Sequence, residues 1–201
     1  EDLTVNTALD NQYKCQIYAA LGGAYYSKKD VAVTVAVDNS LLGSGMRFGS
    51  GKDEILPMPS SYFKLASDKI VIPAGTIAGG VDVQLTDAFF ADPRAIKNTF
   101  VIPLKILSVV NADSVLRGST TKTSPDPRLA GDWGVSPKDY VLYAVKYVNP
   151  FHGVYLRRGV DEVKGSTGNT ALDTTVVYRN TFVEKDEVCN LFTKSMTQDS
   201  I

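Results

Sequence analysis

The heptapeptide VAVTVAV, residues 31–37, decides the fold class of this chain. Valine alternates with alanine or threonine along the whole stretch, and successive side chains of an extended strand point to opposite faces of a sheet. Valine and threonine are also β-branched, which favours strands over helices. The stretch therefore predicts a half-buried core strand with its valines on one face, ended by the turn residues Asp38 and Asn39.

The same alternation recurs through the first half of the chain. It predicts further strands at Tyr13–Ala20, Tyr62–Leu65, Ile70–Ile72, Val81–Leu85 and Phe100–Val110. In the last of these, Pro103 indicates an edge strand or a bulge, because proline has no N–H to donate to a sheet. Between Leu41 and Pro59, glycines and prolines predict a long loop. About seven short strands separated by turns are typical of an immunoglobulin-like β-sandwich.

The composition changes after this first set of strands. Residues 117–136 are rich in Gly, Ser, Thr, Pro and Asp, which predicts a linker. Alternation then resumes at Tyr140–Val148, Val154–Gly159, Thr174–Phe182 and Glu187–Met196.

The chain is therefore predicted to be all-β, with three successive parts. An immunoglobulin-like β-sandwich covers residues 1–116, the linker covers 117–136, and a smaller β-rich C-terminal module covers 137–201. About 65 residues is short for an independent sandwich. The module either packs on the first domain or continues beyond Ile201, in which case it is incomplete here.

Charge and hydropathy exclude several classes of protein. The chain has 201 residues, of which 44% are hydrophobic and 21% charged, so it can bury a core. With 21 Lys and Arg against 22 Asp and Glu there is no basic footprint, and we expect no nucleic-acid partner. No segment approaches the roughly 20 apolar residues that a membrane-spanning helix needs.

The residues that usually carry chemistry are sparse. Cys15 and Cys189 lie near opposite ends, so two free, buried thiols are favoured over a disulfide, and with His152 as the sole histidine a zinc site is excluded. His152 lies in a turn without a serine or cysteine in an elbow motif beside it, which argues against a catalytic triad. The acidic pairs at 161–162 and 184–186 have no special context.

Metal and cofactor sites are not expected either. Asp82, Asp87 and Asp92 are spaced too widely for an EF-hand loop, although carboxylates gathered at a domain edge remain an alternative route to calcium. No glycine-rich phosphate loop opens a helix. We therefore expect a non-enzymatic protein without a cofactor or a bound metal.

Aromatic rings in turns are the best binding candidates. Trp133, the only tryptophan, lies between two glycines in the predicted linker, and Phe151 and Tyr155 flank a turn. Together with Arg158, these residues are the predicted ligand-binding set, because flat rings stack on sugar faces or on other proteins. Two alternatives stay open: Trp133 holds the linker to a domain, and Arg157 or Arg158 forms an inter-domain salt bridge.

Several motifs resemble known sequences. The segment from Pro137 to Gly159, including YVNPFHGVYLRRG, resembles a family of Bacteroidetes surface lipoproteins of unknown function. The segments 70–75, 81–83 and 100–104 resemble the N-terminal module that also occurs ahead of family-18 endo-β-N-acetylglucosaminidases. In the first family the C-terminal module usually continues well past the last predicted strand.

The resemblance implies a function as well as a fold. It implies a non-catalytic, glycan-binding lipoprotein of a polysaccharide-utilisation system, exposed on the outer membrane and anchored by a lipid upstream of Glu1. Its expected partners are an oligosaccharide or glycoprotein glycan and outer-membrane transport proteins. A structural or adhesive module that binds a partner protein is the alternative, and a glycosidase is a third class.

Overall fold

The structure is a computed structural model that describes residues 6–23, 25–49, 53–167 and 169–201. It consists of two compact units, Glu1–Tyr147 and Val148–Ile201. Both are built from strands, as predicted. The described residues contain no helix long and apolar enough to cross a membrane.

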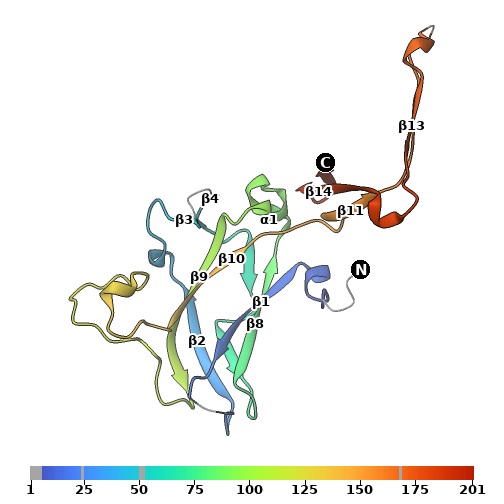
Figure 1. Ribbon diagram of the computed structural model, residues 1–201. Helices are drawn as coiled ribbons and strands as arrows, with labels where there is room; N and C mark the ends of the chain where they lie inside the picture. The colour runs from blue at the N-terminus through green and yellow to red at the C-terminus, as the bar shows by residue number, and fades with distance from the viewer. Residues whose placement is uncertain (1–5, 24, 50–52, 168) are drawn as a thin grey trace. The chain divides into compact units, whose positions relative to one another are not determined.

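Unit 1 is a sandwich of two antiparallel sheets (Figure 1). One sheet has the order β1-β8-β6 and the other the order β10-β9-β2-β7, with β5 added in parallel to the start of β9. The strands are β1 (Lys14–Ala20), β2 (Val31–Val37), β3 (Arg47–Phe48), β4 (Asp53–Glu54), β5 (Leu56–Pro57), β6 (Phe63–Leu65), β7 (Lys69–Ile72), β8 (Ala78–Leu85), β9 (Phe100–Val110) and β10 (Tyr140–Val145). Short helical segments are η1 (Asp10–Gln12), η2 (Asn39–Leu41), α1 (Asp87–Ala91), η3 (Pro93–Ile96) and η4 (Ala130–Asp132).

The core lies between the two sheets. In β2, Val31, Val33 and Val35 are buried and alternate with half-buried neighbours, which confirms the prediction from the alternation, whereas Val37 at the strand's end is exposed. Alternating apolar residues of β7 and β8 are buried in the same way. Five consecutive residues of β9, Phe100–Leu104, are buried, as expected for a central strand covered on both faces.

Pro103 lies in this central strand and not at an edge or at the bulge. The bulge in the β2–β9 pairing falls at Thr34 and Val35 instead. The Pro103 carbonyl accepts a hydrogen bond from the Asp38 amide at 2.9 Å, so the N side of Pro103 faces the same way, toward the end of β2. Pairing of β5 stops at Val101 and pairing of β2 starts at Leu104. The N–H that Pro103 lacks therefore falls at the end of β2, where the Asp38 amide supplies the hydrogen bond of this pair.

A cluster of aromatic rings closes one end of unit 1. Phe89 of α1 is 0% exposed, and its ring lies 5.2 Å from that of Phe90 and 6.0 Å from that of Tyr147. The rings of Tyr62 and Phe100 complete the cluster in edge-on arrangements. The Phe89-Phe90 pair thus plugs the sandwich.

The boundary between the units falls later in the sequence than the predicted linker. Strand β10 pairs with β9 over six residues, from Tyr140 with Lys105 to Val145 with Phe100. Residues 117–136 therefore lie between two neighbouring strands of one sheet, and the first strand of the predicted C-terminal module belongs to unit 1. Tyr147, packed in the aromatic cluster, is its last residue.

Unit 2 has two small antiparallel sheets, β11-β14-β15 and β12-β13. Its elements are β11 (Gly153–Arg157), β12 (Gly159–Val163), η5 (Thr170–Leu172), β13 (Thr174–Tyr178), η6 (Val183–Lys185), β14 (Glu187–Ser195) and β15 (Gln198–Ser200). Among residues 148–167 and 169–201, the buried side chains are Asn149 and Asp186, and no hydrophobic side chain is buried. The Asn149 amide nitrogen donates to Asp199 Oδ1 at 2.8 Å and to two backbone carbonyls of the β14–β15 turn region.

Replacing Phe89 by alanine tests the aromatic plug. We expect Phe89→Ala to lower the free energy of unfolding of unit 1 by about 3–5 kcal/mol, because it removes a fully buried ring from a packed cluster. Urea unfolding followed by the fluorescence of Trp133 measures this. Val71→Ala, at an exposed position of β7, is the control and should cost less than about 1 kcal/mol. Equal losses for the two variants would contradict the assignment.

Candidate functional site

Residues 117–136, named here the Trp133 loop, form an ordered excursion from the edge of unit 1. They are drawn in yellow to orange in Figure 1. Ser119 and Val135 form an isolated antiparallel bridge, with Ser119 N donating to the Val135 carbonyl at 2.9 Å. The Lys138 amide donates to the Leu116 carbonyl at 2.8 Å just outside this bridge. The loop is therefore closed at its base like a hairpin and does not behave as a linker.

Polar contacts inside the loop fix the tryptophan. The indole Nε1–H of Trp133 donates to the Asp126 carbonyl at 2.8 Å. Asp132 Oδ2 accepts from the Asp126 amide at 3.0 Å, and its Oδ1 lies 2.5 Å from the ammonium of Lys122. The Tyr140 hydroxyl donates to the Pro127 carbonyl at 2.8 Å and ties the loop to β10. The alternative prediction was that Trp133 holds the linker to a domain. In the structure its N–H instead bonds a carbonyl of the same loop, so the residue helps to fix the loop itself.

A second ion pair braces the far side of the loop. The guanidinium of Arg128 donates from Nε and Nη2 to the two oxygens of Asp126 at 2.7 Å and 2.5 Å. These hydrogen bonds lower the pKa of Asp126 from 3.8 to about 2. Nη1 of Arg128 also lies 2.9 Å from the sulfur of Met46, in the loop before β3. The hydrogen bond to Lys122 likewise lowers the pKa of Asp132. Both carboxylates are therefore ionised at neutral pH.

The loop encloses a shallow depression of about 340 Å³. Its walls carry hydroxyl groups, one ion pair and one indole, from Ser119, Thr120, Thr121, Lys122, Asp132 and Trp133. Because the indole N–H is already bonded, Trp133 offers ring surface to a ligand, not a donor. The depression therefore places one half-buried aromatic ring beside hydroxyl groups and an ion pair.

The other three predicted site residues lie in unit 2. Phe151 is exposed, and its carbonyl accepts a hydrogen bond from the Tyr155 hydroxyl at 2.7 Å. Arg158 is engaged by the buried Asp186, with Nε 3.3 Å from Oδ2, and its Nη2 donates to the Asn180 carbonyl at 2.8 Å. Phe151 and Tyr155 are thus in contact with one another, whereas Arg158 anchors a turn. Trp133 belongs to unit 1, so the four residues do not form one described site.

The described partners of the arginine pair lie within unit 2. Arg157 lies 2.5 Å from Asp161 and 3.5 Å above the ring centroid of Tyr178, and Arg158 pairs with Asp186. All of these partners are in unit 2. As expected for consecutive strand residues, the two side chains find different partners on different sides of the backbone.

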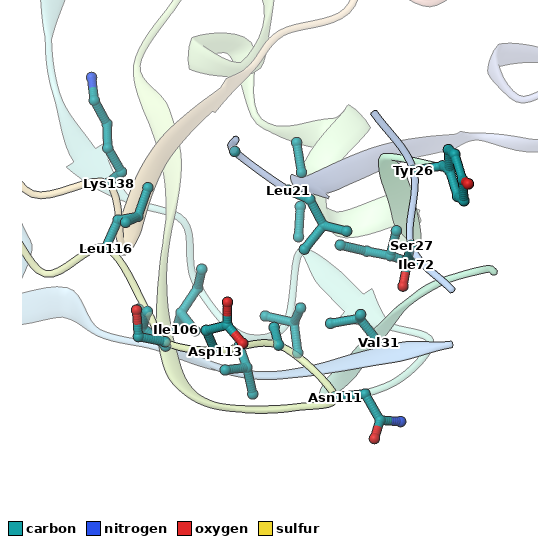
Figure 2. A pocket seen from close by; sticks show the side chains of 18 of the residues that line it. Leu21, Tyr26, Ser27, Val31, Ile72, Ile106, Asn111, Asp113, Leu116 and Lys138 are labelled. Atoms are coloured by element: carbon teal, nitrogen blue, oxygen red, sulfur yellow. The ribbon is translucent and has the colours of Figure 1, made fainter. Parts of the chain in front are cut away.

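A larger cavity, of about 770 Å³, opens at one end of the sandwich (Figure 2). Its floor is made of core residues such as Val31, Ile72 and Ile106, while the side chains of Asn111 and Lys138 extend away from these apolar groups. Asn111 Nδ2 already donates to the Asp30 carbonyl at 2.8 Å. Sequence reasoning missed this cavity, because its lining combines strand residues with loop residues, such as 26–28 and 111–116, that only the folded chain brings together. The lining also combines these apolar side chains with polar ones, among them Ser27, Asp113 and Ser114.

The remaining candidate chemical groups are engaged in local contacts. His152 Nδ1 accepts a hydrogen bond from the Thr193 amide at 3.1 Å. Asp92 accepts from Arg94 at 2.6 Å and from the Tyr62 hydroxyl at 2.9 Å, and the bonds to Arg94 hold its pKa well below the usual range. Asp82 accepts from Gln16 at 2.6 Å. Among the described residues, no group of three or more His, Cys, Asp or Glu side chains is placed to hold a metal ion.

The two cysteines are free thiols, as predicted, and each is half-buried, not fully buried. Burial raises the pKa of Cys15, in β1, to about 11. A thiol that stays protonated is a poor nucleophile.

The raised pKa predicts slow thiol chemistry at Cys15. In a Cys189→Ser variant, where Cys15 is the one remaining thiol, we expect reaction with a disulfide reagent near pH 8 to be roughly 100-fold slower in the folded protein than in urea, because the thiolate fraction falls about tenfold per pKa unit. Timed thiol titration measures the ratio. A folded rate equal to the unfolded one would show that Cys15 is not shielded.

The Asp126–Arg128 pair predicts how the Trp133 loop responds to acid. The pKa of Asp126 is lower in the folded protein than in the unfolded chain, so its stabilising contribution is complete above about pH 4 and is lost as the pH falls toward about 2. Trp133 emission should therefore be constant from about pH 8 to pH 5 and shift to the red below about pH 4.

The variant Asp126→Asn isolates this pair at neutral pH. It keeps the backbone carbonyl that binds the indole but loses the charge that holds Arg128, so we expect red-shifted emission and stronger acrylamide quenching at pH 7. Asp87→Asn, at an exposed position of α1, is the control and should leave the spectrum unchanged. An unchanged spectrum for Asp126→Asn would mean that the ion pair does not order the loop.

Comparisons with known proteins agree with the two-part organisation. A family model with the description "-like, N-terminal domain" matches residues 1–113, and the model of the domain of unknown function DUF5627 matches residues 150–201. No functionally curated protein matches the chain.

Solved structures of proteins from Bacteroides species are similar to this chain. A crystal structure of a Bacteroides ovatus protein of unknown function is 45% identical, with a TM-score of 0.88 over 99% of this chain. The chain spans 62% of that protein's length. An auxiliary nutrient binding protein from Bacteroides thetaiotaomicron is 16% identical, with a TM-score of 0.47 over 91% of this chain and 50% of its own. Since the N-terminal domain model covers more than half of the sequence, the chain belongs to the Bacteroidetes family that this domain defines.

Proposed function

We propose that this protein binds glycans without modifying them, and that the depression of the Trp133 loop is the binding site. The observation that carries the proposal is the indole of Trp133, whose N–H is bonded inside the loop while hydroxyl groups and the Lys122–Asp132 pair surround the ring. Sugars present an apolar C–H face together with hydroxyl groups at their rim. An aromatic face beside fixed polar groups complements both features.

The order of the loop bears on affinity. Its base bridge, its two ion pairs and the Tyr140 contact are all made by residues of the chain itself. A site that is already arranged loses less conformational entropy when it binds. The depression is shallow, however, and we expect dissociation constants on the order of micromolar to millimolar for one site. Many copies on a cell surface would raise the apparent affinity through avidity.

The same geometry argues against catalysis at this site. Glycoside hydrolysis needs two carboxyl groups on either side of the scissile bond, about 5–10 Å apart. Among the described residues that line the depression, Asp132 is the one that carries a carboxylate. This carboxylate forms an ion pair with Lys122. His152, which a hydrolytic triad would need as its base, accepts a backbone hydrogen bond. A binding role therefore fits the contacts better than turnover.

The cellular setting is part of the proposal and rests on sequence. The resemblance to surface lipoproteins, together with membership of a Bacteroidetes family, favours a lipid-anchored protein on the outer membrane. There it would hand oligosaccharides to transport proteins of a polysaccharide-utilisation system. The alternative of an adhesive or structural module is favoured by one observation, the exposed apolar side chains of unit 2.

A glycan array tests the proposal directly. We expect the purified protein to bind a defined set of glycans, Trp133→Ala to weaken binding at least about tenfold, and Trp133→Phe to retain part of it, because a phenyl ring still stacks. Phe151→Ala removes an exposed ring from unit 2 and is the control, with circular dichroism as the check on folding. Binding that Phe151→Ala abolishes and Trp133→Ala spares would move the site to unit 2. Failure to bind any host or plant glycan would favour the adhesive alternative.

A further inference from the structure

Every charged side chain of the Trp133 loop is paired with an opposite charge. The charged residues of the loop are Arg117, Lys122, Asp126, Arg128 and Asp132. Lys122 lies 2.5 Å from Asp132, and Arg128 lies 2.5 Å from Asp126. Arg117 lies 3.2 Å from the buried carboxylate of Asp139, which follows the loop in the sequence. The three cations are therefore balanced by three carboxylates.

The same balance holds in the depression of the loop. Among the described residues that line it, the charged ones are Lys122 and Asp132. Asp132 Oδ2 accepts from the Asp126 amide at 3.0 Å, so the carboxylate is held on one oxygen by the backbone and on the other by the ammonium. The Lys122 side chain is the more exposed partner, at 55% against 14% for Asp132. An anion that approached the ammonium would nevertheless approach the carboxylate as well, because the two groups are in contact.

The neighbouring cations are engaged elsewhere. The guanidinium of Arg128 donates to both oxygens of Asp126, and Nη2 of Arg117 donates to the Leu107 carbonyl at 2.9 Å. Lys138, the first cation after the loop, lines the larger cavity of Figure 2 and not the depression. An incoming anion would thus meet no uncompensated cation among the described residues that line the depression.

Hydroxyl groups are the uncharged polar groups of the depression. The Thr120 hydroxyl donates to the Asp132 carbonyl at 2.5 Å and accepts from the Lys122 amide at 3.0 Å. The hydroxyls of Ser119 and Thr121 have no hydrogen-bond partner in the part of the chain that the structure describes. A hydroxyl both donates and accepts. These two groups can therefore pair with the hydroxyls of a neutral sugar, which do the same.

We propose that the Trp133 loop selects uncharged glycans over acidic ones, such as those that carry uronic acid or sulfate groups, and that Asp132 sets this preference. The inference rests on glycan binding by the loop and adds the class of glycan. Beside the ion pair, the attraction of an anionic sugar to Lys122 is offset by its repulsion from Asp132. The anionic group also loses hydration when it binds, whereas a neutral sugar does not bear this cost.

Quenching of tryptophan fluorescence tests the charge balance without a glycan, because Trp133 is the one tryptophan of the chain. Iodide, caesium and acrylamide are the anionic, cationic and neutral quenchers, and each constant is divided by its value for free N-acetyltryptophanamide. We expect the iodide and caesium values to agree within about twofold at low salt. In Asp132→Asn, where Lys122 has lost its partner, iodide should exceed caesium at least about threefold, and high salt should remove the difference. Acrylamide corrects for any change in access to the ring.

Glycan pairs test the selectivity itself. The members of a pair differ in one group, a hydroxymethyl in the neutral glycan and a carboxylate in the acidic one. We expect the parent protein to bind the neutral member about three- to tenfold more tightly, and Asp132→Asn to shift the ratio toward the acidic member by about tenfold. Adding Lys122→Gln to that variant should restore the ratio. Asp87→Asn, in exposed α1, is the control and should leave it unchanged.

The outcomes separate the class of glycan from glycan binding as such. Tighter binding of acidic members by the parent, or an unchanged ratio in Asp132→Asn, would overturn the inference. If Trp133→Ala then also abolished that binding, the loop would still be the glycan site. Failure of both members of every pair to bind would remove the proposed function and this inference with it. A strong iodide preference in the parent protein, lost at high salt, would overturn the charge balance whatever the glycans show.

Discussion

The pairing of β9 with its neighbours on both sides is the constraint on which unit 1 depends. Phe100–Leu104 is buried on both faces, so each side chain there needs a partner layer, and each edge of the strand needs hydrogen bonds. Strands β2 and β5 satisfy one edge and β10 satisfies the other. Strand β10 runs antiparallel to β9 and begins opposite Lys105, near the end of β9. The chain between Val110 and Tyr140 therefore has to leave the sheet and return to it beside the end of β9. The Trp133 loop is the consequence of that return.

Local sequence pattern predicted the strands well and their partners poorly. The alternation at residues 31–37 and at Tyr140–Val148 corresponds to strands β2 and β10, since alternation reports which side of a strand is buried. It does not report which strand lies alongside. A linker and an ordered loop have the same Gly, Pro, Asp and Ser composition, and what separates them is a bridge such as Ser119 with Val135, formed across many residues of sequence. For that reason the boundary between the units, after Tyr147, differs from the boundary predicted at residues 117–136.

For the candidate site, the sequence likewise indicated the residue but not its contacts. Trp133 stood out as the one tryptophan in a polar segment, but its internal hydrogen bond to the Asp126 carbonyl depends on the folded loop and leaves no signal in the sequence. The pairing of Arg158 with buried Asp186, 28 residues later, is of the same long-range type. Sequence thus indicated which side chains are unusual for their position. It did not indicate which of them are already occupied by neighbours.

The two units stabilise their strands in opposite ways. In unit 1 apolar side chains are packed between sheets, so the Trp133 loop is built on strands that have their own core. In the described part of unit 2 no apolar side chain is fully buried, and buried Asn149 and Asp186 hold the turns. A polar framework of this kind fixes register without supplying much hydrophobic stabilisation, because buried amides and carboxylates contribute chiefly by satisfying groups that would otherwise be unpaired.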